Sequence, residues 1–227
     1  MPKHRVRAVL LVVALFALLV PFNASVDASG QSDSVKSAAT QGEANHDEAA
    51  PSGAPPGEAA QWRTVHNQNF EGTFPPAGWQ IYDASHTGGV GAWGKDTDGF
   101  NSANAAHPSP PTAVYPNNTH TWMRYGPFSL GGAGVTNARM LFKYWMDTES
   151  GYDMFEYAYS CNGTEEWTGR MVSGNGPGPV PAWATATQSL RACIGRTKVY
   201  VQFTFHSDLS VNYEGVFVDN VQIQKFS

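Results

Sequence analysis

The sequence has few of the features that mark enzymes, nucleic-acid-binding proteins or helical proteins. Only 15% of its 227 residues are charged, the net charge is -5, and no cluster of Lys and Arg occurs beyond the extreme N-terminus. This composition argues against nucleic acid as a partner. The Gly-x-Ser-x-Gly motif of serine hydrolases does not occur, and the seven His residues show no zinc-binding spacing. No stretch longer than a turn or two has helical periodicity.

Two pairs of acidic residues keep a catalytic interpretation open. Asp147 with Glu149, and Glu165 with Glu166, supply the two carboxylates that a glycosidase needs. Carboxylates at the ends of hairpins are far more often solvated turn residues. Catalysis by these pairs is therefore the weaker interpretation.

The N-terminus has the pattern of a secretory signal peptide, which we predict to cover residues 1–28. A basic segment, Pro2–Arg7, precedes an apolar run of about 15 residues, Ala8–Phe22. A membrane-spanning helix needs about 20 such residues. Small residues then follow at Val26-Asp-Ala28, where a signal peptidase can cleave. We expect a secreted, extracellular protein with no stable membrane span after cleavage; the alternative is an uncleaved membrane anchor.

Residues 29–60 predict a disordered linker. They are small, polar and acidic, contain no aromatic residue, and offer too little apolar area to offset the entropy lost on ordering. All seven Trp lie after them, between Trp62 and Trp183. The folded domain is therefore predicted to cover residues 61–227.

The folded part has the pattern of short strands joined by turns. Gly (23 residues) and Pro (15 residues) are frequent, and apolar residues alternate with polar ones. The predicted strands are Trp62–Phe70, Trp79–Asp83, Thr121–Phe128, Ala138–Met146, Asp153–Cys161, a segment after Trp183, Lys198–His206 and Glu214–Ile223. Residues 84–120 predict long loops around short extended pieces. Roughly eight to ten short strands in one unit predict an all-β fold, a jelly-roll β-sandwich.

One carboxylate stands out in the last predicted strand. If that strand is regular, Asp219 shares a face with Phe217, Val221 and Ile223. A lone carboxylate on an apolar face costs several kcal/mol unless it is paired, hydrogen-bonded or bound to a metal. A β-bulge that turns Asp219 outward, a hydrogen bond to a nearby loop, and metal coordination are all open on spacing alone.

The chain contains two cysteines, Cys161 and Cys193. In an exported protein we expect them to form a disulfide. The alternative is a pair of buried free thiols.

Seven short motifs occur in an order that resembles one family of secreted bacterial proteins. They are Phe70-Glu-Gly72, Phe74-Pro-Pro-Ala-Gly-Trp79, Tyr125-Gly-Pro-Phe128, Tyr152-Asp153, Ser160-Cys-Asn-Gly-Thr-Glu-Glu-Trp167, Val199-Tyr-Val-Gln-Phe203 and Gly215-Val-Phe-Val-Asp-Asn-Val221. Together they resemble the MAM-like, choice-of-anchor J or cleaved-adhesin jelly-roll domains, and the C-terminal module of immune-inhibitor-A-type metallopeptidases. The resemblance covers about residues 65–225. The sequence departs from the family pattern in two ways. The usual Asp-Gly-Gly hairpin before the Trp is replaced by Cys161-Asn-Gly-Thr164, and the residues before the domain do not resemble a peptidase.

The resemblance implies a structural Ca²⁺ ion that joins the first and last strands. The matching ligands are Glu71 and Asp219, and Asp98, or else Asp96, is the best-placed third carboxylate. Ca²⁺ prefers six to eight hard oxygen ligands, which agrees with carboxylates from separate loops. The family further implies a non-catalytic binding or adhesion module that recognises an extracellular glycan or protein. The alternative is an accessory domain of a secreted hydrolase, or a small peptidase or glycan-active enzyme.

Overall fold

The computed structural model describes residues 59–85, 92–110, 114–164 and 166–227. The predicted signal peptide and nearly all of the predicted linker lie outside these residues. Within them, no helix is long and apolar enough to span a membrane. In these described residues the folded domain consists of strands and one short 3₁₀ helix, η1 (Arg191–Cys193).

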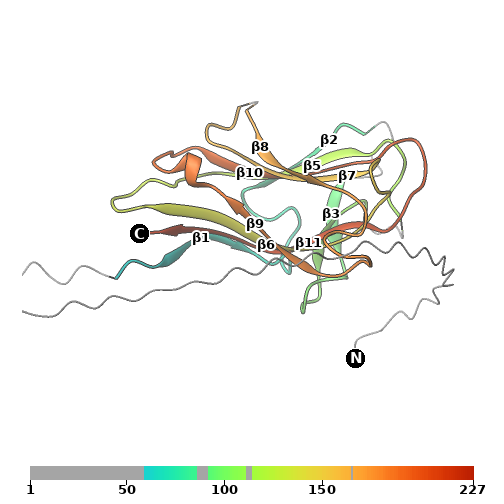
Figure 1. The fold of residues 1–227 in the computed structure, drawn as a ribbon, viewed down its shortest axis with the longest axis horizontal. Coiled ribbons are helices and arrows are strands. Elements are labelled where there is room, and N and C mark those ends of the chain that lie inside the picture. Colours follow the sequence, from blue (N-terminus) through green and yellow to red (C-terminus); the bar gives the residue numbers. More distant parts are fainter. Residues whose placement is uncertain (1–58, 86–91, 111–113, 165) are drawn as a thin grey trace, which may run out of the picture. The chain divides into compact units, whose positions relative to one another are not determined.

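The strands form two antiparallel sheets that face each other, as Figure 1 shows. The first sheet contains β1 (Trp62–Gln68), β3 (Trp93–Asp96), β4 (Ala105–Pro108), β6 (Asn137–Asp147), β9 (Ala184–Ser189) and β11 (Gly215–Phe226). Its order is β3-β4-β11-β6-β9, and β1 also pairs with β11. The second sheet contains β2 (Trp79–Asp83), β5 (His120–Phe128), β7 (Met154–Ser160), β8 (Thr168–Val172) and β10 (Val199–His206), in the order β2-β5-β10-β7-β8. The predicted all-β sandwich is confirmed.

The core lies between the sheets, and alternation along the strands fills it. In β6, Met140, Phe142, Tyr144 and Met146 are buried, as their spacing predicts. The apolar row of β10 faces them from the other sheet, and the rings of Phe142 and Phe203 meet edge to face at 4.8 Å. Burying such a side chain contributes roughly 1.5–3 kcal/mol, so these rows hold the two layers together.

The last strand differs from its predicted pattern because it contains a β-bulge. Pairing with β6 shifts register between Asp219 and Gln222, and Asn220 has a φ of 50°. Before the bulge Val216 and Val218 belong to the core, and after it Val221 and Ile223 do. The prediction that Phe217, Asp219, Val221 and Ile223 share one face is therefore wrong, because one extra residue reverses the alternation.

Asp219 consequently lies on the outer face of the first sheet. It pairs with Lys143, whose neighbours in β6, Phe142 and Tyr144, point into the core. The bulge anticipated as one explanation of Asp219 is present, but it does not bring the carboxylate to solvent. Its exposure is 0% because a loop covers it.

A disulfide joins Cys161, just after β7, to Cys193 in η1. It ties the second sheet to the segment that follows β9. The predicted pairing is confirmed.

Candidate functional site

The loop between β3 and β4, residues 97–104, covers Asp219 and satisfies its carboxylate. The Phe100 backbone N–H and the Ser102 hydroxyl donate to Oδ2 at 2.9 and 2.7 Å, and the Asn220 N–H donates to Oδ1 at 2.6 Å. Burial raises the pKa of Asp219, these hydrogen bonds partly offset the rise, and the charge of Glu71 adds to it. The hydrogen bond to a nearby loop, a further explanation of Asp219, is thus observed.

The same loop also holds Glu71, from the turn after β1. Its two carboxylate oxygens accept hydrogen bonds from the backbone N–H and the side-chain amide of Asn104, at 2.7 and 2.8 Å. These bonds lower the pKa of Glu71. The structure therefore brings Glu71 and Asp219, which are far apart in sequence, to one loop.

Asp98 is exposed in this loop. In the described part of the chain, the three carboxylates close enough to share one ion are Glu149, Asp153 and Asp208 rather than Glu71, Asp98 and Asp219. Of the three predicted calcium ligands, Glu71 and Asp219 thus lie near each other, and Asp98 is not grouped with them.

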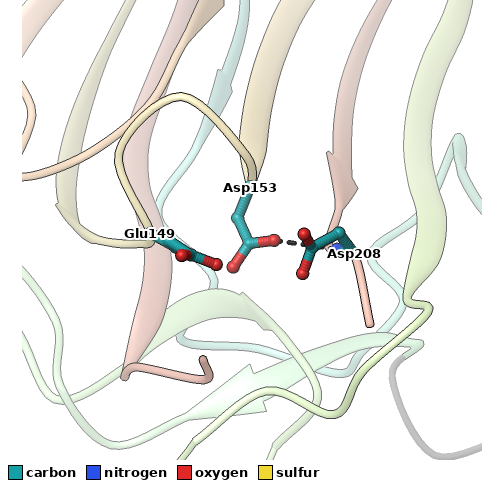
Figure 2. A group of neighbouring side chains, drawn as sticks. All are labelled: Glu149, Asp153 and Asp208. Carbon is teal, nitrogen blue, oxygen red and sulfur yellow. Dashed lines mark hydrogen bonds between the residues drawn. The ribbon is translucent and has the colours of Figure 1, made fainter. Parts of the chain in front are cut away.

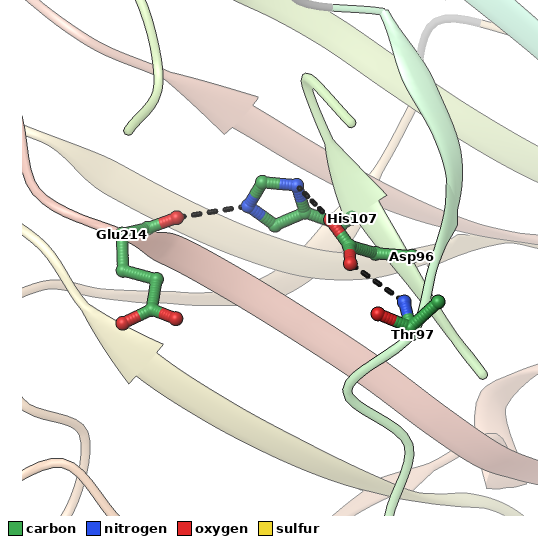
Figure 3. Close-up of polar contacts among 4 residues, drawn as sticks. All are labelled: Asp96, Thr97, His107 and Glu214. Atoms are coloured by element: carbon green, nitrogen blue, oxygen red, sulfur yellow. Dashed lines mark hydrogen bonds and ion pairs between the residues drawn. The ribbon is translucent and has the colours of Figure 1, made fainter. Parts of the chain in front are cut away.

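Asp96, the other candidate for the third position, faces a buried histidine at the base of the loop. One of its oxygens lies 3.7 Å from Nδ1 of His107, and the other accepts the Thr97 N–H (Figure 3). Nε2 of His107 lies 2.8 Å from the Glu214 carbonyl oxygen, and the ring stacks on Phe217. Burial lowers the pKa of His107. The base of the loop is therefore anchored to the start of β11, because Nε2–H of His107 donates to the Glu214 carbonyl.

Sequence reasoning missed a group of aromatic side chains on the outer face of the second sheet. Tyr82 and Trp122 are direct partners on β2 and β5, and their rings stack at 5.5 Å with 15° between planes. The Arg124 guanidinium lies 5.3 Å from the centre of the Tyr82 ring and 4.6 Å from that of Trp167. We call Tyr82, Trp122, Arg124 and Trp167 the aromatic platform.

Polar groups surround the platform. Arg124 donates twice to Oε1 of Gln202, at 3.1 and 2.9 Å, which fixes the guanidinium over the sheet. The Trp122 indole N–H is buried and has no hydrogen-bond partner within the described structure. The alternation in β10 places Gln202 on the face opposite Val201 and Phe203, which are buried. It could not show that Tyr82 and Trp167, from other strands and loops, join that face.

A pocket of about 400 Å³ adjoins the platform. It is lined by Ala84, Asn118, Thr119, His120, His206 and Ser207. The His120 ring lies 5.3 Å from the Trp122 ring, so the pocket and the platform are neighbours. Together they form a surface with flat apolar rings and several hydrogen-bonding groups.

The fold is similar to that of two bacterial adhesin domains. The K3 cleaved adhesin domain of Lys-gingipain from Porphyromonas gingivalis W83 aligns with a TM-score of 0.50 and 19% identity, over 72% of this chain and 99% of that chain. The K1 domain of the same protein aligns with a TM-score of 0.51 and 18% identity, over 70% and 96%. At these identities the likeness shows the fold alone.

Carbohydrate-binding modules align less well. TmCBM61, solved in complex with β-1,4-galactotriose, has a TM-score of 0.45 and 11% identity, over 71% of this chain and 97% of that chain. A score at this level supports no inference about a ligand. No protein-family model and no curated protein matches the sequence. The comparisons thus show a β-sandwich fold similar to that of the two cleaved adhesin domains.

Proposed function

We propose that this domain is a non-catalytic binding module that recognises an extracellular glycan on the outer face of its second sheet. The observation that carries the proposal is the aromatic platform beside the pocket. The apolar face of a sugar ring stacks on flat aromatic side chains, while its hydroxyls bond to a few placed polar groups. The platform offers Tyr82 and Trp122 for stacking, and the lining of the neighbouring pocket offers hydrogen-bonding groups such as His120 and Asn118.

The platform is ordered before any ligand arrives. Arg124 is held by Gln202 and lies over two rings, so little side-chain freedom remains to be lost on binding. Such preorganisation favours affinity because ordering costs are already met.

The test is an array of glycans and matrix proteins probed with the purified chain, followed by calorimetry on the best glycan. Trp122→Ala and Tyr82→Ala are each expected to raise Kd about tenfold or more, equivalent to about 1.4 kcal/mol. Trp62→Ala, a partly buried Trp on the other sheet, is the matched control and should leave Kd unchanged. Equal affinities for wild type and Trp122→Ala would contradict the glycan site. Binding to matrix proteins alone would replace the glycan by a protein ligand.

We also propose that the domain is exported and belongs with the MAM-like, choice-of-anchor J and cleaved-adhesin domains. The Cys161–Cys193 disulfide supports export, since disulfides persist in oxidising compartments. The likeness in fold to cleaved adhesin domains supports an adhesive role. The finer family assignment depends on the seven motifs.

A structural Ca²⁺ held by Glu71 and Asp219 remains part of the proposal. The donor set fits this ion, because two neighbouring carboxylates from separate segments of the chain meet at the β3–β4 loop. Bound there, Ca²⁺ would cross-link the turn after β1, the β3–β4 loop and β11. A site saturated about a hundredfold adds roughly 2.7 kcal/mol to stability.

Thermal melting in excess Ca²⁺ and in EDTA tests this site. The rise in Tm with Ca²⁺ is expected to be smaller in Asp219→Asn than in wild type. Equal rises in the two proteins would contradict coordination by Asp219, and its hydrogen bonds to the loop would then be its whole role.

A further inference from the structure

Three acidic side chains converge at the end of the sandwich where β7 begins and β10 ends. Glu149 comes from the turn between β6 and β7, Asp153 precedes β7 directly, and Asp208 follows β10. One carboxylate oxygen from each lies within 4.8 Å of the others. The antiparallel pair His206–Met154 brings the two strand ends together, which explains how residues 55 positions apart meet.

Neutral donors serve part of this cluster. Asp153 is completely buried, and it accepts hydrogen bonds from the Tyr115 hydroxyl and from the Asp208 backbone N–H at 2.8 Å (Figure 2). Asp208 accepts the Ser210 N–H through Oδ1 at 2.9 Å. Each carboxylate oxygen has two lone pairs, so Asp153 and Asp208 retain free acceptor capacity. Among the described residues, no Lys or Arg side chain pairs with any of the three carboxylates.

Glu149 supplies a separate observation. The Glu149 side chain is half-buried, and its Oε2 atom, which is fully buried, has no hydrogen-bond partner within the described structure. Figure 2 shows the Glu149 carboxylate directed toward Asp153. Buried polar atoms in folded proteins are nearly always satisfied, so an orphan oxygen facing two other carboxylates points to a missing positive group.

The donor set selects the chemistry of that group. Every side chain in the cluster offers oxygen, and no His or Cys belongs to it. Zn²⁺ sites in proteins are built largely from Cys and His, whereas Ca²⁺ takes carboxylate, carbonyl and water oxygens in flexible geometry. Loops from separate parts of the chain provide that flexibility.

We propose that Glu149, Asp153 and Asp208 form a second cation site, for Ca²⁺ or a similar hard divalent ion. The site is distinct from the one proposed at Glu71 and Asp219. Ion binding at it depends on neither the aromatic platform nor a glycan. Water completes the coordination. The ion fastens the β6–β7 turn to the segment after β10.

Terbium luminescence tests the site directly, because Tb³⁺ takes the oxygen ligands of Ca²⁺ and is excited by a nearby tyrosine. The Tyr115 hydroxyl bonds to Asp153, so its ring is close enough to sensitise a bound ion. Wild-type protein is expected to give saturable emission that excess Ca²⁺ displaces. Glu149→Gln and Asp208→Asn are each expected to weaken Tb³⁺ and Ca²⁺ binding tenfold or more.

Two controls separate this site from charge in general and from Asp219. Glu166→Gln removes one exposed carboxylate near the far end of β7 and should bind as wild type does. Asp219→Asn should retain the tyrosine-sensitised emission. Glu149→Gln should fold normally by circular dichroism, because among the described residues the Glu149 carboxylate makes no hydrogen bond that the amide would lose.

Three results would overturn the proposal. The first is no Ca²⁺-displaceable emission from wild type, and the second is equal affinity in wild type, Glu149→Gln and Asp208→Asn. The third is loss of emission in Asp219→Asn alone, which would assign the ion to the other site. None of these results bears on glycan binding, which the array measures independently.

Discussion

Asp219 and Asp153 are both completely buried, but different groups surround them. Around Asp219, the β3–β4 loop and the β-bulge supply three donors, and the nearby Glu71 is satisfied by Asn104. Around Asp153 there are two donors, and two further carboxylates lie within 4.8 Å, one of them with an unpaired buried oxygen. In the first arrangement each carboxylate oxygen accepts at least one hydrogen bond. The second has more negative charge than its donors compensate.

Burial alone therefore does not identify a cation site. A buried carboxylate is stable when enough N–H and O–H groups point at it. The informative feature is the carboxylate charge that those donors leave uncompensated. By this criterion the acidic cluster has the stronger need for an ion, although the family resemblance points to Asp219.

The largest expected effect comes from removing the satisfied carboxylate. Asp219→Ala leaves the Phe100 and Asn220 N–H groups without an acceptor, and each unpaired buried donor costs roughly 1–3 kcal/mol. We expect a loss of about 3 kcal/mol in the free energy of unfolding, measured with urea in EDTA. The control is Asp83→Ala, which removes an exposed carboxylate with one local bond, to the Ser85 N–H. A loss similar to that of the control would show that the loop does not depend on Asp219.

A smaller loss is expected from loosening the loop itself. The Phe100 ring packs edge to face against Trp183, and the Lys143 ammonium lies 4.4 Å from its centre. A fully buried Phe replaced by Ala loses about 3–5 kcal/mol, and for this half-buried ring we expect roughly 1–2 kcal/mol. Hydrogen exchange at the Phe100 amide, which donates to Asp219, should accelerate in Phe100→Ala. Unchanged protection would mean that Asp219 alone positions the loop.

In the acidic cluster of Glu149, Asp153 and Asp208, removing a charge is expected to raise the stability of the ion-free protein rather than lower it. In EDTA, Glu149→Gln is expected to melt at a slightly higher temperature than wild type, since it removes repulsion from Asp153 and Asp208 and breaks no hydrogen bond. In excess Ca²⁺ the order should reverse, because the variant loses a ligand. Differential scanning calorimetry of both proteins, with Glu166→Gln alongside, measures the two differences. A lower Tm for Glu149→Gln in EDTA would show that the cluster is stable without an ion.

The smallest expected effect concerns the half-buried His66, whose neutral form is favoured by burial. His66 accepts the Trp79 indole N–H at 3.3 Å and stacks on Tyr125 at 3.7 Å. Burial lowers its pKa below the ordinary value of 6.5. A lowered pKa means that the contribution of neutral His66 is fully present above about pH 6.5 and is lost as the pH falls through the folded pKa.

We therefore expect stability to fall slightly more between pH 7 and pH 5 in wild type than in His66→Gln, which keeps an acceptor but does not titrate. Urea midpoints at the two pH values give the comparison. The same pH dependence in both proteins would exclude His66 as a source of it.

Alternation in the sequence was enough to predict much of the sandwich. Met140 to Met146 and Val199 to Phe205 are strictly periodic, and the structure buries both rows. The pattern failed at Thr168–Val172, because β8 is an edge strand whose residues are mostly exposed, so no buried face leaves a signature. It also failed at Phe217–Ile223, where a β-bulge reverses the alternation of inward and outward residues. No Gly or Pro within this segment marks the bulge in the sequence.

Local periodicity was enough to predict the all-β class and the jelly-roll sandwich, and to single out Asp219. Because the chain has only two cysteines, it also offered Cys161 and Cys193 as a pair, and the structure shows that they are bonded. The side of the sheet that Asp219 occupies, the aromatic rings that share the outer face, and the meeting of Glu149, Asp153 and Asp208 could be found only in the folded structure. These depend on strand order and register, and the pairing of β7 with β10 links positions that no local pattern connects.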